Sequence, residues 1–231
     1  MQFIKRNKMI KKKYLFIIPA RKGSTRIKNK NIKYINNKPL IYWTLKNLYN
    51  FKKKYEIIIS TNDQKIKKIA KNLKFEVPFL RPKKLATKSS KIIHTIKHAI
   101  RYYEKKEIYF ENICLLQVTS PLRNSEDIKK CIKIFEKNNS DSLITVFDLF
   151  KTYKKKLFYM KYKNKIKTHY NKIKNKLYVM NGPAILITKT NCIMKNKLYG
   201  KNISYYEMPY YRSFDINVYE DLKICEVLNE G

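Results

Sequence analysis

The sequence predicts an α/β protein, built on a doubly wound and mostly parallel sheet. Apolar runs of strand length alternate along the chain with segments in which apolar residues recur at helical spacing. The runs are apolar throughout rather than alternating with polar residues, which is typical of strands covered on both faces. A length of 231 residues suits one domain, residues 1–231, in which we place an insertion at about 151–176.

Three strands and three helices are expected in the first part of the chain. The strand candidates are 14–19, 55–61 and a less apolar run at 75–80, and the helix candidates are 39–50, 63–72 and 90–103. Pro39 suits the first turn of a helix because its missing N–H has no partner there. Asp63 suits the position before a helix, where its carboxylate can accept from a free N–H group.

The second part of the chain continues the pattern with one interruption. Strands are expected at 112–119, 142–148 and 177–188, and a helix is expected to follow Ser125 as its N-cap. The stretch 151–176 is rich in lysine, tyrosine and asparagine without a helical period, which predicts short strands and loops or a flexible arm. The end of the chain, from residue 213, is expected to hold the last residues of a strand followed by a helix.

The net charge of +36 ordinarily suggests a polyanionic partner such as nucleic acid. Only 7 of the 53 basic residues are arginine, however, whereas nucleic-acid readers use arginine heavily for its planar, bidentate donors. Lysine (46), asparagine (22) and tyrosine (19) share A/T-rich codons, so genome composition accounts for much of the bias. We therefore expect no nucleic-acid partner, and the alternative is a basic nucleic-acid-binding protein that has lost catalysis.

The cellular location is inferred from the cysteines and from the start of the chain. The chain has four cysteines, Cys114, Cys131, Cys192 and Cys225. They form no CxxC pair, which favours a reduced, cytoplasmic protein. The apolar run 14–20 leads into Arg21 without a cleavage site, so it is interpreted as a buried strand rather than a signal peptide, and Met9 is an alternative start. No run approaches the roughly 18 apolar residues of a membrane span, so no membrane partner is expected.

The stretch 17–31, IIPARKGSTRIKNKN, joins the end of the first strand to a basic loop. It lacks the GK[ST] ending of a P-loop and the GxGxxG spacing. A glycine and a serine beside several cations at a strand end nevertheless suit a polyphosphate, because backbone N–H groups and a hydroxyl donate while Arg and Lys neutralise charge. The alternative is a solvated basic loop in a lysine-rich chain.

Polar clusters follow the carboxyl ends of several expected strands. They are 21–31 after the first strand, Arg81 after the third, 117–123 after the fourth and Asp215 after the last. Ligands of doubly wound sheets bind at this edge. These loops, far apart in the sequence, are therefore expected to converge on one site.

Six stretches of the chain resemble the acylneuraminate cytidylyltransferases (CMP-sialic acid synthetases), including the CMP-legionaminate and CMP-pseudaminate synthetases. They are IIPARKGSTRIKNKN (17–31), ISTND (59–63), FLRPKKLAT (79–87), LLQVTSPLR (115–123), NGPAILI (181–187) and SFDINVYEDL (213–222). Together they span almost the whole chain in the family's order and spacing. The resemblance implies a Rossmann-like nucleotidyltransferase fold with a small inserted dimerisation segment, and hence a homodimer.

The family's reaction transfers CMP from CTP to the anomeric hydroxyl of a sugar acid and releases pyrophosphate, so an enzyme is expected. By resemblance, the nucleotide-binding residues are Arg21, Gly23, Ser24, Lys30, Asn31 and Arg81, the last at the position that meets cytosine. Gln117, Asn181 and Gly182 match positions that bind the sugar, while residues 120–123 shape their loop. Arg21, Lys30 and Gln117 are the expected catalytic residues.

The resemblance also implies a Mg²⁺ cofactor, held by Asp215 and Asn217. Family members usually carry Asp-x-Asp there, whereas Asn217 keeps a carbonyl oxygen but no charge. One carboxylate together with nucleotide phosphates can bind Mg²⁺. The alternative is an impaired enzyme.

A second departure from the family means that the sequence does not identify the sugar. The sialate enzymes carry an arginine before Asn-Gly that helps to bind the sugar carboxylate, whereas NKIKNKLYVMNG (171–182) has none. Lys172 and Lys174 are the candidates to replace it, without the bidentate fork of arginine. A nine-carbon sialic, legionaminic or pseudaminic acid is expected, with Kdo or a non-sugar acid as the alternative.

Overall fold

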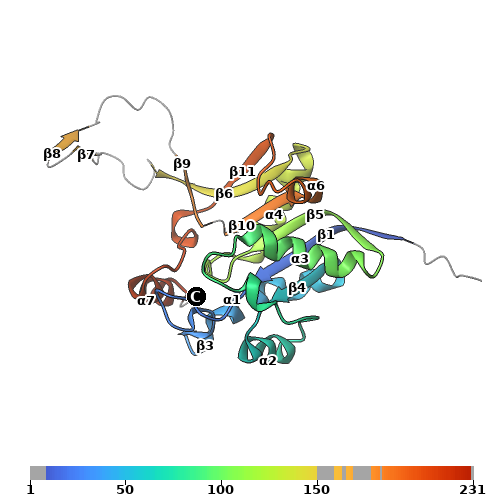
Figure 1. The fold of residues 1–231 in the computed structure, drawn as a ribbon. Helices are drawn as coiled ribbons and strands as arrows, with labels where there is room; N and C mark the ends of the chain where they lie inside the picture. The colour runs from blue at the N-terminus through green and yellow to red at the C-terminus, as the bar shows by residue number, and fades with distance from the viewer. Residues whose placement is uncertain (1–8, 150–158, 163–164, 169–177, 183, 230–231) are drawn as a thin grey trace, which may run out of the picture.

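A sheet of seven strands forms the centre of the part of the chain that the structure describes. The structure is a computed structural model and describes residues 9–149, 159–162, 165–168, 178–182 and 184–229 (Figure 1). The strand order is β11-β6-β10-β5-β1-β4, and β9 pairs with β6. The strands are β1 (Ile10–Pro19), β4 (Glu56–Ser60), β5 (Ile108–Leu116), β6 (Ser142–Asp148), β9 (Tyr178–Met180), β10 (Ile185–Lys189) and β11 (Ile203–Glu207).

The strand directions decide which loops share an edge of this sheet. β1 pairs in parallel with β4 and β5, and β11 pairs in parallel with β6. β10 runs antiparallel to both β5 and β6, so the predicted mostly parallel sheet is confirmed with β9 and β10 as exceptions. Because β10 is antiparallel to β5 and β6, the residues that precede β10 lie at the edge where the parallel strands end.

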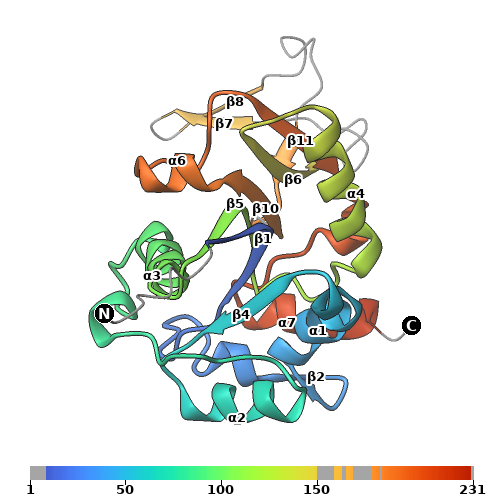
Figure 2. The same cartoon turned by 90° about the vertical axis from the view of Figure 1, so that its right-hand side faces the viewer.

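Helices cover both faces of the sheet, which confirms the doubly wound architecture. Figure 2 shows α3 and α6 on one side of the sheet and α1 and α4 on the other. One core layer holds α1 (Leu40–Leu48), α2 (Gln64–Asn72), α4 (Ser125–Lys137) and α7 (Tyr219–Leu228), and the other holds α3 (Ile92–Glu104) and α6 (Thr190–Met194).

Strand β1 shows why the sequence requires two covered faces. Tyr14, Phe16 and Ile18 pack in the layer of α1 and α4, while Leu15 and Ile17 pack in the layer of α3. All five side chains are at most 1% exposed. Successive side chains of a strand point to opposite faces, so an uninterrupted apolar run is stable only with cover on both.

Most expected elements are confirmed, with shifted ends. Asp63 caps α2, because its carboxylate accepts from the N–H of Lys65 at 2.9 Å. β6 covers the expected 142–148. β1 and β5 begin earlier than expected because they pair with each other along polar residues that continue both strands. α4 is capped by Asn124, not by Ser125, which is its first helical residue.

Three expectations about strands are wrong. No strand forms at 75–80, where Glu76 and Leu80 make isolated bridges and Pro78 has no N–H to continue a ladder. The expected strand at 177–188 is divided into β9 and β10 by the turn at Asn181. Residues 213–217, where the end of a strand is expected, form no strand. The sequence pattern also does not predict β11 and α6.

Short elements complete the described chain. They are β2 (Tyr34–Ile35), β3 (Lys38–Pro39), the hairpin strands β7 (Tyr159–Tyr162) and β8 (Lys165–Thr168), and the 3-10 helices η1 (Lys30–Ile32), η2 (Tyr49–Lys53), η3 (Lys83–Leu85) and η4 (Tyr210–Arg212). The hairpin lies within the expected insertion, most of which falls outside the described residues. None of the described helices is both long enough and apolar enough to cross a bilayer. All four cysteines are free, and three of them are buried.

Candidate active site

The loops that follow the parallel strands meet the turn before β10 at one edge of the sheet. β1, β4 and β5 end there, and the turn at Asn181 and Gly182 leads into β10. Lys30 from the first loop and Thr119 from the loop after β5 both bond to Ile216, which lies before α7. The expected convergence of these loops is therefore confirmed.

The opening loop curls back on itself around Arg21. Nη1 of Arg21 donates to the carbonyl of Gly23 at 2.8 Å and reaches the carbonyl of Ala86 at 3.4 Å. The amide of Asn31 donates to the carbonyl of Arg21 at 3.0 Å. Gly23 has a φ of 85°, a left-handed conformation that side chains disfavour, so the turn requires glycine. Ser24 is half-buried in the same turn.

Lys30 links this loop to the stretch that carries Asp215. Its Nζ donates to the carbonyl of Ile216 at 2.6 Å. Burial lowers the pKa of Lys30, nearby Arg26 and Arg21 add to the decrease, and Asp215 opposes it. The ammonium group is therefore poorly hydrated and lies among charges of both signs, the acids Asp215 and Asp221 and the cations Arg26 and Arg21.

Arg81 is a buried cation at the end of β4. Its side chain is 5% exposed, and Nε and Nη2 donate to the hydroxyl and carbonyl of Ser60 at 3.1 and 2.5 Å. Burial, with the charge of Arg21, lowers the pKa of Arg81 to about 10, so it stays protonated at neutral pH. Nη1 keeps its donors, which suits a ligand edge with two acceptors.

Arg123 is structural, as expected for the residues that shape the loop after β5. Its side chain is 1% exposed, and Nη1 donates to the carbonyls of Gln117 and Ala184 at 3.1 and 2.6 Å. Nη2 donates to the Thr44 hydroxyl at 2.9 Å. The guanidinium therefore fixes the backbone at Gln117, whose side chain is half-buried at the edge.

Asp215 is packed directly against Gly182. A Cβ on Gly182 would lie 2.6 Å from Cγ of Asp215, and the φ of 81° also requires glycine there. Burial raises the pKa of Asp215, while Thr119, Asn217 and Lys30 oppose the rise. Oδ1 of Asp215 is buried without a hydrogen-bond partner among the described residues.

Asn217 stabilises Asp215 in place of a second carboxylate. Its amide nitrogen donates to Oδ2 of Asp215 at 2.9 Å. Asp221 is engaged elsewhere, because its carboxylate accepts from the N–H groups of Asn217 and Val218 at 2.6 and 2.9 Å in the first turn of α7. The unpartnered oxygen of Asp215 beside an amide side chain fits the oxygen-ligand chemistry of Mg²⁺.

The side chain of Asn181 forms hydrogen bonds within the protein. Its Oδ1 accepts from the Thr145 hydroxyl at 2.6 Å, and Nδ2 donates to the sulfur of Met208 at 3.2 Å. The side chain is 3% exposed. It therefore fixes the turn that presents Gly182.

A buried ion pair near this edge was not among the residues singled out in the sequence. Arg212 donates to both carboxylate oxygens of Asp127, from Nε at 3.1 Å and Nη2 at 2.9 Å, and Tyr206 donates at 3.1 Å. Asp127 is fully buried in the first turn of α4. The pair braces the stretch leading to Asp215. Acids in a first helical turn signal a capping role, but no signal in the sequence identifies Arg212 as the partner.

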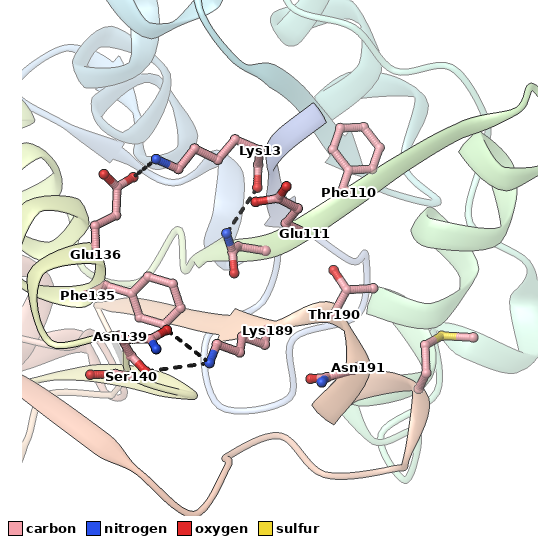
Figure 3. Close-up of a pocket in the computed structure, with 12 residues that line it drawn as sticks. Lys13, Phe110, Glu111, Phe135, Glu136, Asn139, Ser140, Lys189, Thr190 and Asn191 are labelled. Atoms are coloured by element: carbon pink, nitrogen blue, oxygen red, sulfur yellow. Dashed lines mark hydrogen bonds and ion pairs between the residues drawn. The ribbon is translucent and has the colours of Figure 1, made fainter. Parts of the chain in front are cut away.

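A cavity of about 710 Å³ lies at the opposite edge of the sheet (Figure 3). Lys13 of β1 and Lys189 of β10 line it, and both are paired with acids, Glu136 at 2.9 Å and Asp141 at 3.2 Å. None of the candidate residues lines this cavity. It is therefore separate from the candidate site.

Similar sequences and folds are known for most of the chain. A family model described as cytidylyltransferase matches residues 15–228. The CMP-N,N'-diacetyllegionaminic acid synthase of Legionella pneumophila is 35% identical over 132 residues, 57% of this chain and 56% of that protein. The pseudaminic acid cytidylyltransferase of Campylobacter jejuni is 27% identical over 94% of this chain and 96% of its own length.

A solved structure has a fold similar to that of this chain. The structure of a CMP:2-keto-3-deoxy-manno-octonic acid synthetase complexed with CTP superposes with a TM-score of 0.69 at 13% identity. The match covers 94% of this chain and 98% of that chain. At this identity the likeness concerns the fold alone.

Proposed function

The chain belongs to the cytidylyltransferase family, and from this premise we propose that it transfers CMP from CTP to the anomeric hydroxyl of an acidic nine-carbon sugar, releasing pyrophosphate. The observation that carries the proposal is the meeting of Arg21, Lys30 and Asp215 at the edge where the parallel strands end. The names of the legionaminic and pseudaminic acid relatives support the class of sugar.

Arg21 and Lys30 would bind the triphosphate. The α-phosphorus must be attacked in line while negative charge builds on the leaving pyrophosphate, so positioning and fixed cations supply most of the catalysis. Each side chain donates to a backbone carbonyl, and neither forms an ion pair with a described residue, although the charge of Asp215 acts on Lys30. Gly23, Ser24 and Asn31 would complete the nucleotide loop, and Arg81 would present Nη1 to cytosine.

Asp215 and Asn217 would hold Mg²⁺. When bound, the metal would neutralise phosphate charge and orient the triphosphate. The fit rests on the buried, unpartnered Oδ1 of Asp215. Asn217 can add a carbonyl oxygen as a second ligand once its amide, whose nitrogen now donates to Asp215, is turned toward the metal. Gly182 would keep Asp215 in place, because only a residue without a Cβ leaves room for that carboxylate. The sugar acid would meet Gln117, near the turn fixed by Asn181.

Pyrophosphate release tests this proposal directly. The protein is given CTP, UTP, ATP or GTP with Mg²⁺, each with N,N'-diacetyllegionaminic, pseudaminic or N-acetylneuraminic acid, and Kdo serves as the comparison substrate. We expect release with CTP and a nine-carbon acid. Equal release with all four nucleotides would contradict the role of Arg81 at the base, and release with Kdo alone would contradict the class of sugar.

A homodimer and a cytoplasmic location are part of the proposal. β9 and β11, which both pair with β6, expose apolar side chains, Met180 at 44% and Tyr205 at 51%. The expected interface at 151–176 lies mostly outside the described residues, so the support comes from these two strands. Two chains of charge +36 repel, and low salt should weaken the pair. Sedimentation at about 0.15 M salt and in low-salt buffer tests this, and a monomer in both contradicts it. The free cysteines support the location.

A further inference from the structure

The loop after β5 holds a hydroxyl group that the proposed function does not use. We propose that Thr119 is a positioning residue that orients the amide of Gln117, so that its N–H donors face the sugar acid. This role rests on the proposed function and deepens it, because it identifies the group that decides how Gln117 meets the substrate.

The backbone of this loop is fixed on both sides of Val118. Arg123 donates from Nη1 to the carbonyl of Gln117 at 3.1 Å. The N–H of Ile216 donates to the carbonyl of Thr119 at 2.8 Å. Val118 itself is 1% exposed. The Thr119 side chain is therefore carried on a backbone with little freedom to move it away from Gln117.

The Thr119 hydroxyl contacts the amide oxygen of Gln117. The hydroxyl donates to Oε1 at 3.3 Å. This orientation directs Nε2 away from Thr119, and none of the described residues accepts a hydrogen bond from it. Both of its N–H donors are therefore available. A sugar acid offers carboxylate and hydroxyl oxygens, so two free donors at this edge match its chemistry.

Asp215 competes for the same proton. Its carboxylate lies close to the Thr119 hydroxyl, which carries only one proton. Asn217 donates to Oδ2 of Asp215 at 2.9 Å, so this carboxylate also has a donor of its own, and the Thr119 hydroxyl lies 3.3 Å from Oε1 of Gln117. The neighbouring Ser120 is fully buried, and its hydroxyl has no partner among the described residues, so it provides a matched control in the same loop.

Steady-state kinetics of hydroxyl variants test the role. Thr119→Val removes the hydroxyl at nearly constant shape, Thr119→Ser keeps it, and Ser120→Ala is the control. Pyrophosphate release is measured with the three nine-carbon acids at saturating CTP and Mg²⁺, and with varied CTP at saturating acid. Thr119→Val should raise KM for the sugar acid about 3- to 10-fold, as for one neutral hydrogen bond, with KM for CTP unchanged. Thr119→Ser and Ser120→Ala should match the wild type.

Gln117→Glu provides a second variant in case Thr119→Val does not fold. It keeps an acceptor toward Thr119 and removes the donors, so it should raise the same KM. An unchanged sugar KM with Thr119→Val, or no recovery with Thr119→Ser, overturns the positioning role and leaves the proposed function standing. An unchanged sugar KM with Gln117→Glu removes Gln117 from the sugar site, and the role of Thr119 falls with it. A folded wild-type protein that turns over none of the three acids removes the proposed function, and the role of Thr119 falls with it.

Discussion

The two edges of the central sheet differ in how their charged side chains are partnered. At the amino-terminal edge, the lysines that line the cavity are paired with acids, Lys13 with Glu136 and Lys189 with Asp141. At the carboxyl-terminal edge, none of Arg21, Lys30 and Arg81 forms an ion pair with a described residue, and each donates to neutral oxygens instead.

Charge pairing, rather than cavity volume, therefore distinguishes the candidate site from the opposite edge. A partly buried cation without a counterion destabilises the empty protein. Such groups gathered from distant loops are expected where a ligand supplies the missing opposite charge. The cavity at the other edge has a volume of about 710 Å³, but both of its lysines already have acidic partners, so it offers an anion little.

The largest expected effect comes from removing the acid that would hold the metal. Asp215→Asn should lower turnover roughly 1000-fold or more, because the group that would hold the metal loses its charge. Pyrophosphate release with CTP and the preferred sugar acid measures this. An Asp215→Asn enzyme of normal rate would place the metal elsewhere.

The same substitution should stabilise the metal-free protein. Burial raises the pKa of Asp215, so ionisation is unfavourable in the folded state and destabilises it at neutral pH. As pH falls through the raised pKa, the wild-type carboxyl becomes protonated and the penalty disappears. The advantage of Asp215→Asn in free energy of unfolding should therefore be present at pH 7 and shrink in acid, as urea unfolding can show. An advantage that grows in acid would contradict this sign.

The adjacent cations Arg21 and Lys22 are expected to differ, because only Arg21 is placed to bind phosphate. Arg21→Ala should lose about 30- to 1000-fold in rate, the value of one charge-assisted contact to developing charge. Lys22→Ala is the control, because the Lys22 side chain is exposed and its N–H already bonds to Asn62 at 2.8 Å. Wild-type rates in both variants would remove the phosphate-binding role of this loop.

Arg212 also lies near the carboxyl-terminal edge, but it forms an ion pair with Asp127. Arg212→Ala should cost about 3 kcal/mol in free energy of unfolding, since it leaves the buried carboxylate of Asp127 unpaired. Lys129→Ala breaks an exposed ion pair with Glu126 and should cost less than about 1 kcal/mol. Urea unfolding of both variants measures the difference. Equal losses would mean that the buried pair contributes no more than a surface one.

The smallest effect is expected at the amino-terminal edge. Glu111→Gln together with Asn191→Ala alters the wall of the cavity at two exposed residues. The value of kcat/KM for CTP should stay within about twofold of the wild type, as for ordinary surface substitutions. A tenfold loss would show that this edge takes part in the reaction after all.

The arrangement of the active edge follows from local sequence features. Uninterrupted apolar runs locate β1, β5 and β6, and the loops that follow strands must then share an edge. The sequence does not predict β11, because Ser204 and Glu207 interrupt its apolar character and it becomes a strand through pairing with β6. The apolar run at 75–80 predicts a strand, but Pro78 has no N–H group with which to continue a ladder.

Other features depend on contacts between residues that are distant in sequence. Nothing local to Gly182 predicts that a carboxylate 33 positions later would occupy the space of its missing Cβ. Arg212 and Asp127 are 85 residues apart, and neither has an unusual neighbourhood in the sequence. Such pairings are decided by the completed core, so pattern and propensity alone do not reveal them.

The four free cysteines make the protein a reporter of its own opening. Cys114 and Cys131 are fully buried in the core and burial raises the pKa of both thiols, and burial raises the pKa of Cys225 on α7 to about 12. Cys192 is half-exposed. A thiol reagent should therefore modify Cys192 first. Labelling of Cys225 would then time the detachment of the last helix, and labelling of Cys114 would time the opening of the sheet itself.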